Sequence, residues 1–71
     1  MSFKNAEIQL CSFTTEGKGI DLPEDAQWYS SPSEGKDAAR AILVKYPYIA
    51  NVWVRKVRAG HIRTVTMVNR P

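Results

Sequence analysis

The fold is decided by residues 49–69, IANVWVRKVRAGHIRTVTMVN, near the end of a 71-residue chain. Two runs rich in valine, isoleucine and threonine, 49–58 and 61–69, flank the dipeptide Ala59-Gly60. Runs of this kind on either side of a two-residue turn predict a β-hairpin. Because alanine is poorly suited to a primed two-residue turn, a four-residue loop is the alternative, and it keeps the same register.

Counting outward from the turn assigns the side chains of the hairpin to two faces of a sheet. One face carries an apolar patch on which we expect a helix to pack, made of Val52, Val54, Val65 and Met67. The other face carries Asn51, Trp53, Arg55, Thr64 and Thr66, with Val57, Ile62 and Val68 among them. A single helix leaves this second face uncovered, and an exposed apolar patch usually marks an interface. Alternatively, the N-terminal segment covers it with Phe3, Phe13 or Trp28.

The sequence Ser31-Pro32-Ser33-Glu34 predicts the start of a helix. A serine at the N-cap accepts a hydrogen bond from the amide three residues on, and a glutamate at that position reaches back to the serine amide. Proline fits the first helical position because its missing N–H would be unpaired there. An apolar stripe with helical spacing follows, made of Ala38, Ala39, Ile42, Leu43 and Tyr46. Because a proline comes directly after Tyr46, we expect the helix to cover about residues 32–46.

The N-terminal part of the chain predicts less regular structure. Alternating apolar and polar residues predict a strand over about 5–13, and two glycines, a proline and five charges make 14–25 a loop. Two aromatic residues favour a short strand at about 26–30. We therefore predict an α+β fold in a single domain, residues 1–71. Its architecture is a small single-layer antiparallel sheet, ββαββ or βαββ, with one helix packed on one face.

Composition narrows the functional classes. Residues 1–37 hold seven acids and three bases, whereas residues 38–71 hold seven bases and no acid, although the net charge is only +3. One cysteine excludes an intrachain disulfide, and one cysteine with one histidine cannot supply the four ligands of a structural zinc. No apolar run is long enough to span a membrane, and no signal peptide is recognisable. We expect a cytoplasmic protein that uses no metal or other cofactor.

We expect no enzymatic activity and no catalytic residues. The single histidine, His61, lies at the hairpin turn, and acid–base catalysis needs a carboxylate or nucleophile within hydrogen-bond reach. No acidic residue follows Asp37 in the sequence, so none lies near His61 along the chain. Glu24 and Asp25 are adjacent in the predicted loop, where we interpret them as solvated charges.

The basic hairpin is the candidate binding site, and its residues are Trp53, Arg55, Lys56, Arg58, His61 and Arg63. In the predicted register Lys56 lies opposite Arg63 and Arg58 lies opposite His61. Like charges facing each other destabilise a sheet, so folding alone does not favour this arrangement. A two-stranded basic ribbon is one way to contact nucleic-acid phosphates, and the indole of Trp53 could stack on an unpaired base.

Four interpretations of the hairpin remain open at this point. Nucleic-acid binding is the leading hypothesis. A second is a protein-interaction module that docks on an acidic partner surface, such as a small regulator or inhibitor of the kind phages and mobile elements encode. A third is an obligate homodimer joined through the uncovered face. In the fourth, the basic residues only protect a solvated sheet edge, or they pair with the acids of residues 16–25.

Overall fold

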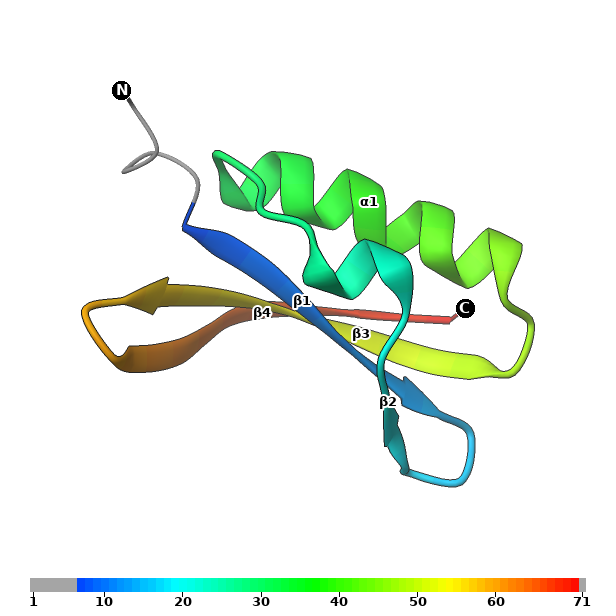
Figure 1. The fold of residues 1–71 in the computed structure, drawn as a ribbon. Helices are drawn as coiled ribbons and strands as arrows, with labels where there is room; N and C mark the ends of the chain where they lie inside the picture. Colours follow the sequence, from blue (N-terminus) through cyan, green and yellow to red (C-terminus); the bar gives the residue numbers. More distant parts are fainter. Residues whose placement is uncertain (1–6, 71) are drawn as a thin grey trace.

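The structure is a computed structural model that describes residues 7–70. In chain order its elements are β1 (Ile8–Thr14), β2 (Gly19–Ile20), the 3-10 helix η2 (Pro23–Ala26), α1 (Pro32–Lys45), β3 (Ile49–Arg58) and β4 (His61–Asn69). The strands form one antiparallel sheet in the order β2-β1-β3-β4, and α1 lies across one face of it (Figure 1). The predicted α+β class is confirmed, with the strands and the helix in the order ββαββ.

The segment before the helix differs from the prediction. Residues 26–30 do not form a strand: Tyr29 makes only an isolated bridge to Ile8, with backbone hydrogen bonds of 2.8 and 3.0 Å. The loop predicted over 14–25 instead contains β2 and most of η2. The physical reason is that η2 begins at Pro23 and runs to Ala26, so that between η2 and Ser31, which caps α1, only Tyr29 pairs with β1.

The predicted start of the helix is confirmed, except for the partner of the Glu34 carboxylate. The Ser31 hydroxyl accepts from the backbone N–H of Glu34 at 3.2 Å, and Pro32 is the first helical residue. The Glu34 carboxylate accepts from the backbone N–H and hydroxyl of Ser30, at 3.2 and 2.8 Å, rather than from the Ser31 amide. The helix therefore begins where the sequence placed it, with its glutamate bound one residue earlier than expected.

The core lies between α1 and the sheet, and at Gly35 the helix backbone comes close to the strands. A methyl group added at Gly35 would lie 2.9 Å from Ile8 Cγ2 and 3.0 Å from Val54 Cγ1. The first turns of α1 can therefore approach β1 and β3 this closely only where the helix has no side chain. The buried apolar residues around this contact are Ile8, Leu10, Leu22, Ala39, Ile42, Leu43, Ile49, Val52 and Val54.

The hairpin has the predicted register near its turn but not farther along. Val57 pairs with Ile62 and Arg55 with Thr64, as expected. The next residue of β3, Val54, pairs with Thr66, so β4 contains a bulge with one extra residue. Beyond this bulge every predicted pair is wrong by one residue.

The bulge changes which residues of β4 face the helix. Val68 pairs with the buried Val52 and packs against the core, whereas Trp53 pairs with Met67 on the other face. Val65 and Met67 remain 43% and 44% exposed. The predicted placement of these two side chains beneath the helix is therefore wrong, because the bulge exchanges the two faces of β4 beyond Thr64 and puts Val68 in the core.

The C-terminal end of α1 is held by Arg70, a residue that the sequence analysis did not single out. Its Nη2 donates to the carbonyl oxygens of Leu43, Tyr46 and Ile49 at 2.8, 2.9 and 2.7 Å, and its Nε donates to Ile49 at 3.0 Å. Helix-terminal carbonyls lack partners within the helix, and a cation near them is favourable. Arg70 therefore joins the end of α1 to the start of β3.

Replacing Gly35 by alanine is expected to destabilise the protein. Alanine is favoured over glycine in a helix by about 1 kcal/mol, but the new methyl group would crowd Ile8 and Val54. Overpacking of a core costs about 1–3 kcal/mol. The midpoint of urea unfolding should be lower for Gly35→Ala than for the wild type. It should not be lowered in Ser33→Ala, which changes an exposed position in the same turn. An unchanged or higher midpoint for Gly35→Ala would contradict the close contact.

Candidate functional site

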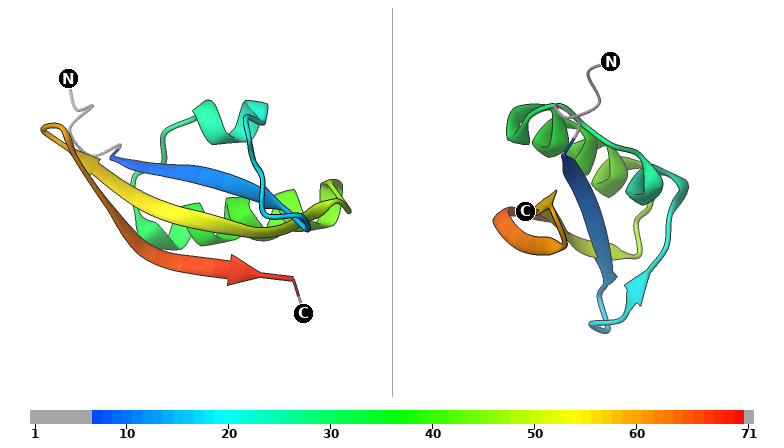
Figure 2. Two further views of the ribbon diagram at one scale, coloured as in Figure 1. Left: turned by 90° about the horizontal axis from the view of Figure 1, so that it is seen from below. Right: turned by 60° about the vertical axis from the view of Figure 1, so that its left-hand side comes forward.

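The tip of the hairpin extends past the start of α1, away from the helical layer (Figure 1, Figure 2). Val54 lies beneath the helix at Gly35, but Lys56 and Arg58, two and four residues farther along β3, are exposed. The alternation of β3 places these two side chains on the helix side of the sheet, in a region that α1 does not cover. The tip is thus a two-stranded projection from the packed domain.

Four basic side chains gather at this projection, and we call them the tip cluster: Lys56, Arg58, His61 and Arg63. Lys56 pairs directly with Arg63 and Arg58 with His61, as the sequence predicted. All four residues are exposed, and together with Ala59 they line a shallow depression of about 240 Å³. The turn itself is tight, with Ala59 at φ 50° and Gly60 at φ 85°.

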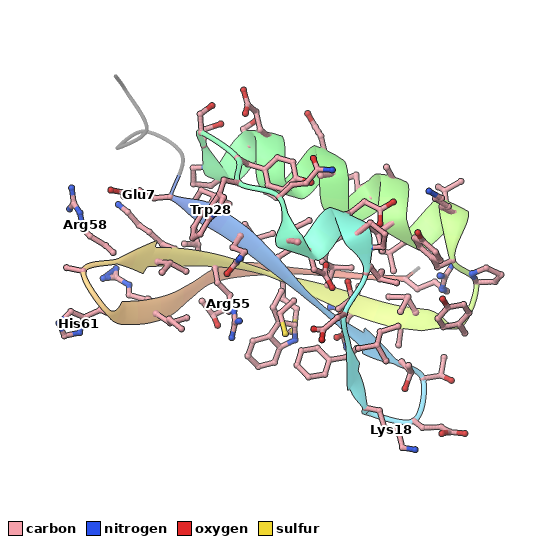
Figure 3. The ribbon with its side chains drawn as sticks, viewed as in Figure 1. Glu7, Lys18, Trp28, Arg55, Arg58 and His61 are labelled. Carbon is pink, nitrogen blue, oxygen red and sulfur yellow. The ribbon has the colours of Figure 1, made fainter. Side chains whose placement is uncertain are left out.

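The other two predicted site residues, Trp53 and Arg55, lie on the opposite face of the sheet. The alternation of β3 separates them from Lys56, and Figure 3 shows Arg55 below the sheet, on the side away from α1. We call this surface of the sheet the open face. The predicted site therefore divides into the tip cluster and a separate pair on the open face.

One member of the tip cluster has an ionic partner within the described residues. Arg58 Nε lies 3.5 Å from Glu7 Oε2, just before β1, and Figure 3 shows the two side chains together. Within residues 7–70, Arg55, Lys56 and Arg63 form no ion pair, and no basic residue of the hairpin pairs with an acid of residues 16–25. The cross-strand pair of Lys56 and Arg63 therefore keeps its like charges unopposed.

The open face combines aromatic and apolar side chains. The rings of Trp53 and Phe13 are 5.4 Å apart at 49°, and Trp53 pairs with Cys11 on one side and Met67 on the other. Phe13 thus lies beside Trp53 on this face. Trp28 does not cover the face: it is 49% exposed and lies near the start of α1, above the sheet in Figure 3. Phe3, the remaining candidate for a cover, lies outside the described residues.

Two buried polar atoms on β3 lack a hydrogen-bond partner within the described residues. They are Asn51 Oδ1 and Arg55 Nε, and they flank Trp53 along the strand. Buried polar side-chain atoms usually have a partner, so each exception needs an explanation. Both residues alternate onto the open face with Trp53, so the two atoms lie beneath this face.

A buried carboxyl group at the edge of β1 was not expected from the sequence. Asp25, interpreted there as solvated, is 8% exposed, and its carboxylate accepts from the Ser12 hydroxyl at 3.0 Å and the Leu22 backbone N–H at 3.3 Å. Burial raises the pKa of Asp25 above its ordinary value of 3.8, and the two hydrogen bonds oppose the shift. The only sequence signal was its place in the first turn after Pro23, where aspartate commonly caps a turn.

Glu24 has a structural role as well. Its carboxylate binds Lys45 Nζ at 3.2 Å and the Tyr46 hydroxyl at 3.2 Å, so η2 is tied to the C-terminal end of α1. Its own backbone hydrogen bond, followed by the bonds from Lys45 and Tyr46, lowers the pKa of Glu24. Glu24 and Asp25 therefore both serve the fold rather than acting as free loop charges.

A cavity of about 300 Å³ opens beside Asp25, between η2 and the edge of β1, and Cys11, Asp21 and Arg55 also line it. Within residues 7–70, no group of three metal-binding side chains comes together there or elsewhere. Over the same residues, no helix has the length and apolar character needed to cross a membrane.

Comparisons of this chain with protein-family models, with curated proteins and with solved structures find no match. The functional conclusion therefore depends on the contacts and charges of the chain itself. Two features remain without a role in folding: the unopposed charges of the tip cluster, and the open-face aromatic pair of Trp53 and Phe13 with Arg55 beside it.

The pH dependence of stability is expected to involve Asp25. Because its pKa is raised in the folded state, that state binds the proton more tightly than the unfolded chain does. The free energy of unfolding should therefore fall as the pH rises from about 4 through the raised pKa. Asparagine can keep both bonds, accepting from Leu22 and donating to the Ser12 hydroxyl, and it cannot ionise.

We therefore expect the stability of Asp25→Asn, relative to the wild type, to improve as the pH rises from about 4 to about 7. Urea unfolding followed at several pH values measures this difference. Asp21→Asn, at an exposed neighbouring position, is the control and should follow the wild type. Parallel pH profiles for the wild type and Asp25→Asn would show that Asp25 titrates as it does in the unfolded chain.

Proposed function

We propose that this protein binds nucleic acid through the phosphate backbone, using the tip cluster as its contact surface. The observation that carries the proposal is the direct cross-strand pairing of Lys56 with Arg63, both exposed and without an ion pair within residues 7–70. Like charges opposite each other on a sheet weaken it. A polyanion that binds both side chains at once would remove this repulsion and gain two charge-assisted contacts.

The shape of the tip supports the proposal. A projecting ribbon two strands wide can reach a groove or a loop of nucleic acid without a clash from α1. Arginine and lysine are the side chains that most often contact phosphate, and the depression between them is open to solvent. Arg58 can join them by exchanging Glu7 for a phosphate, because that ion pair is long and exposed on the arginine side.

The proposed activity is binding without catalysis, in the cytoplasm. His61 is the residue of the cluster best suited to proton transfer, but the other members are basic and none is a carboxylate or a nucleophile. The single cysteine, Cys11, remains a free thiol, which suits a reducing compartment.

Affinity for a labelled oligonucleotide should fall steeply with salt. If Lys56, Arg58 and Arg63 each neutralise one phosphate, the slope of log K against log salt is about −2.7 for a duplex. Raising the salt from about 50 to about 200 mM should then weaken binding roughly fortyfold. Fluorescence anisotropy over a salt series measures the slope.

Arg63→Gln should reduce this slope to about −1.8, because one phosphate contact is lost. Lys18→Gln is the charge-matched control: Lys18 lies in the turn between β1 and β2, far from the tip in Figure 3, and its removal should leave the slope unchanged. Equal effects of the two substitutions would indicate binding through net charge alone. No binding to duplex or single-stranded DNA or RNA at low salt would overturn the proposal, and retention on an acidic protein instead would favour the protein-interaction hypothesis.

A further inference from the structure

The strands of the open face carry positive charge, and Asp21 and Asp25, which share a cavity with Arg55, form no ion pair with it. None of the four strands contains an acidic residue. On the open face the only ionisable group that is charged at all ordinary pH values is the guanidinium of Arg55, next to the aromatic pair of Trp53 and Phe13. A partner that fits this surface must therefore offer both a flat apolar group and a hydrogen-bond acceptor or negative charge.

The two buried atoms without partners make the requirement more specific. Arg55 Nε is a donor and needs an acceptor, whereas Asn51 Oδ1 is an acceptor and needs a donor. These atoms lie two residues to either side of Trp53, about 7 Å along the strand in each direction. Both atoms are buried, so a ligand that stacks on Trp53 and carries donors and acceptors at its edges pairs with them only when the Asn51 and Arg55 side chains turn outward.

A second copy of this chain fits the open face poorly. Self-association through this surface would add a second Arg55 guanidinium to a face whose strands contain no acid. The charge of the strands therefore favours a partner that differs from the protein itself.

Resting on the proposed function, we propose that the nucleic acid is single-stranded and that it lies across the open face, with an unpaired base stacked on Trp53. Every base has a flat face and polar edges, and the adjoining phosphate can bind the Arg55 guanidinium, which forms no ion pair within residues 7–70. In a duplex the bases stack on one another and their faces are not available to Trp53. The open face thus selects for unpaired strands, and the tip cluster supplies attraction for phosphates of any kind.

The division of the site between two faces supports this selection. Trp53 and the tip cluster lie on opposite sides of the hairpin, so a rigid duplex held by the tip cluster does not reach Trp53 at the same time. A flexible single strand can pass around the exposed edge of β4 and contact both. Single-strand binding should therefore depend on Trp53, and duplex binding should not.

The test compares a labelled single strand of about 12 nucleotides with a duplex of about 12 base pairs. A strand of this length is within the range of site sizes known for single-strand binding. Trp53→Leu keeps an apolar side chain but removes the aromatic ring. It should weaken single-strand binding at least about fivefold, the lower end of the effect of losing one stacked base. Duplex binding should be unchanged. Trp53→Phe should recover part of the loss, and Trp28→Leu, the same substitution outside the open face, should have no effect.

A fluorescence measurement tests the same contact without altering it. The chain has two tryptophans, so in Trp28→Phe the emission comes from Trp53 alone. Adding unlabelled single strand should quench this emission in proportion to binding, and adding duplex should not. Thermal unfolding of each variant establishes that it is folded.

The failures of this inference and of the proposed function can be told apart. Equal binding of single strand and duplex, or unchanged single-strand binding by Trp53→Leu without quenching, would overturn the inference and leave the phosphate contacts of the tip cluster intact. Absence of all nucleic-acid binding would overturn both. Concentration-dependent dimers in light scattering that Trp53→Leu abolishes would show that a second copy of the chain occupies the open face. Displacement of the strand by polyglutamate at equal charge would show that charge alone holds the strand, which would also overturn the inference.

Discussion

The contact between Gly35 and the side chains of Ile8 and Val54 fixes how α1 lies on the sheet. Because this is the first part of α1 to touch the sheet, it also determines how much of the hairpin the helix covers. Val52 and Val54 lie beneath it, and the alternating positions that follow, Lys56 and Arg58, lie beyond it. The alternation along β3 that places Val52 and Val54 in the core therefore also places Lys56 and Arg58 on the helix side of the sheet, where they are exposed to solvent.

The sequence was sufficient where the structure depends on short-range interactions. The N-cap of α1 is set by four consecutive residues, and the pairs next to the turn follow from the turn itself. The bulge near Val65 could not be predicted in this way, because Val65, Met67 and Val68 are all apolar and either register satisfies the alternation. Only the position of α1, which belongs to another part of the chain, decides that Val68 and not Met67 packs on the core.

Long-range polar contacts were missed for a related reason. Asp25 meets Ser12 across 13 residues, and Arg70 meets the end of α1 across as many as 27. Nothing local distinguishes either residue from a solvated charge, since their partners are defined only by the fold. The candidate site was predictable to the extent that it follows strand alternation. Strand alternation places Trp53 and Arg55 on one face of the hairpin and the tip cluster on the other. It gives no sign of the two buried atoms without partners beside Trp53.

The uneven charge of the chain can now be separated into structural and unopposed parts. Of the seven bases in residues 38–71, three have acidic partners within the described residues: Arg40 with Asp37, Lys45 with Glu24, and Arg58 with Glu7. A fourth, Arg70, is held by carbonyl oxygens at the end of α1 opposite the tip. The bases that remain are Arg55, Lys56 and Arg63, which are neighbours on the hairpin but lie on both of its faces.

This distribution has a consequence for how selection could act on the protein. The contacts that hold α1 and η2 in place are concentrated away from the tip, and the three unopposed bases contribute little to them. Substitutions at these bases can therefore change binding while the core stays intact, and relief of the repulsion between Lys56 and Arg63 should if anything stabilise the hairpin. An anionic partner that contacts both side chains, as proposed above, would account for their joint presence on the ladder.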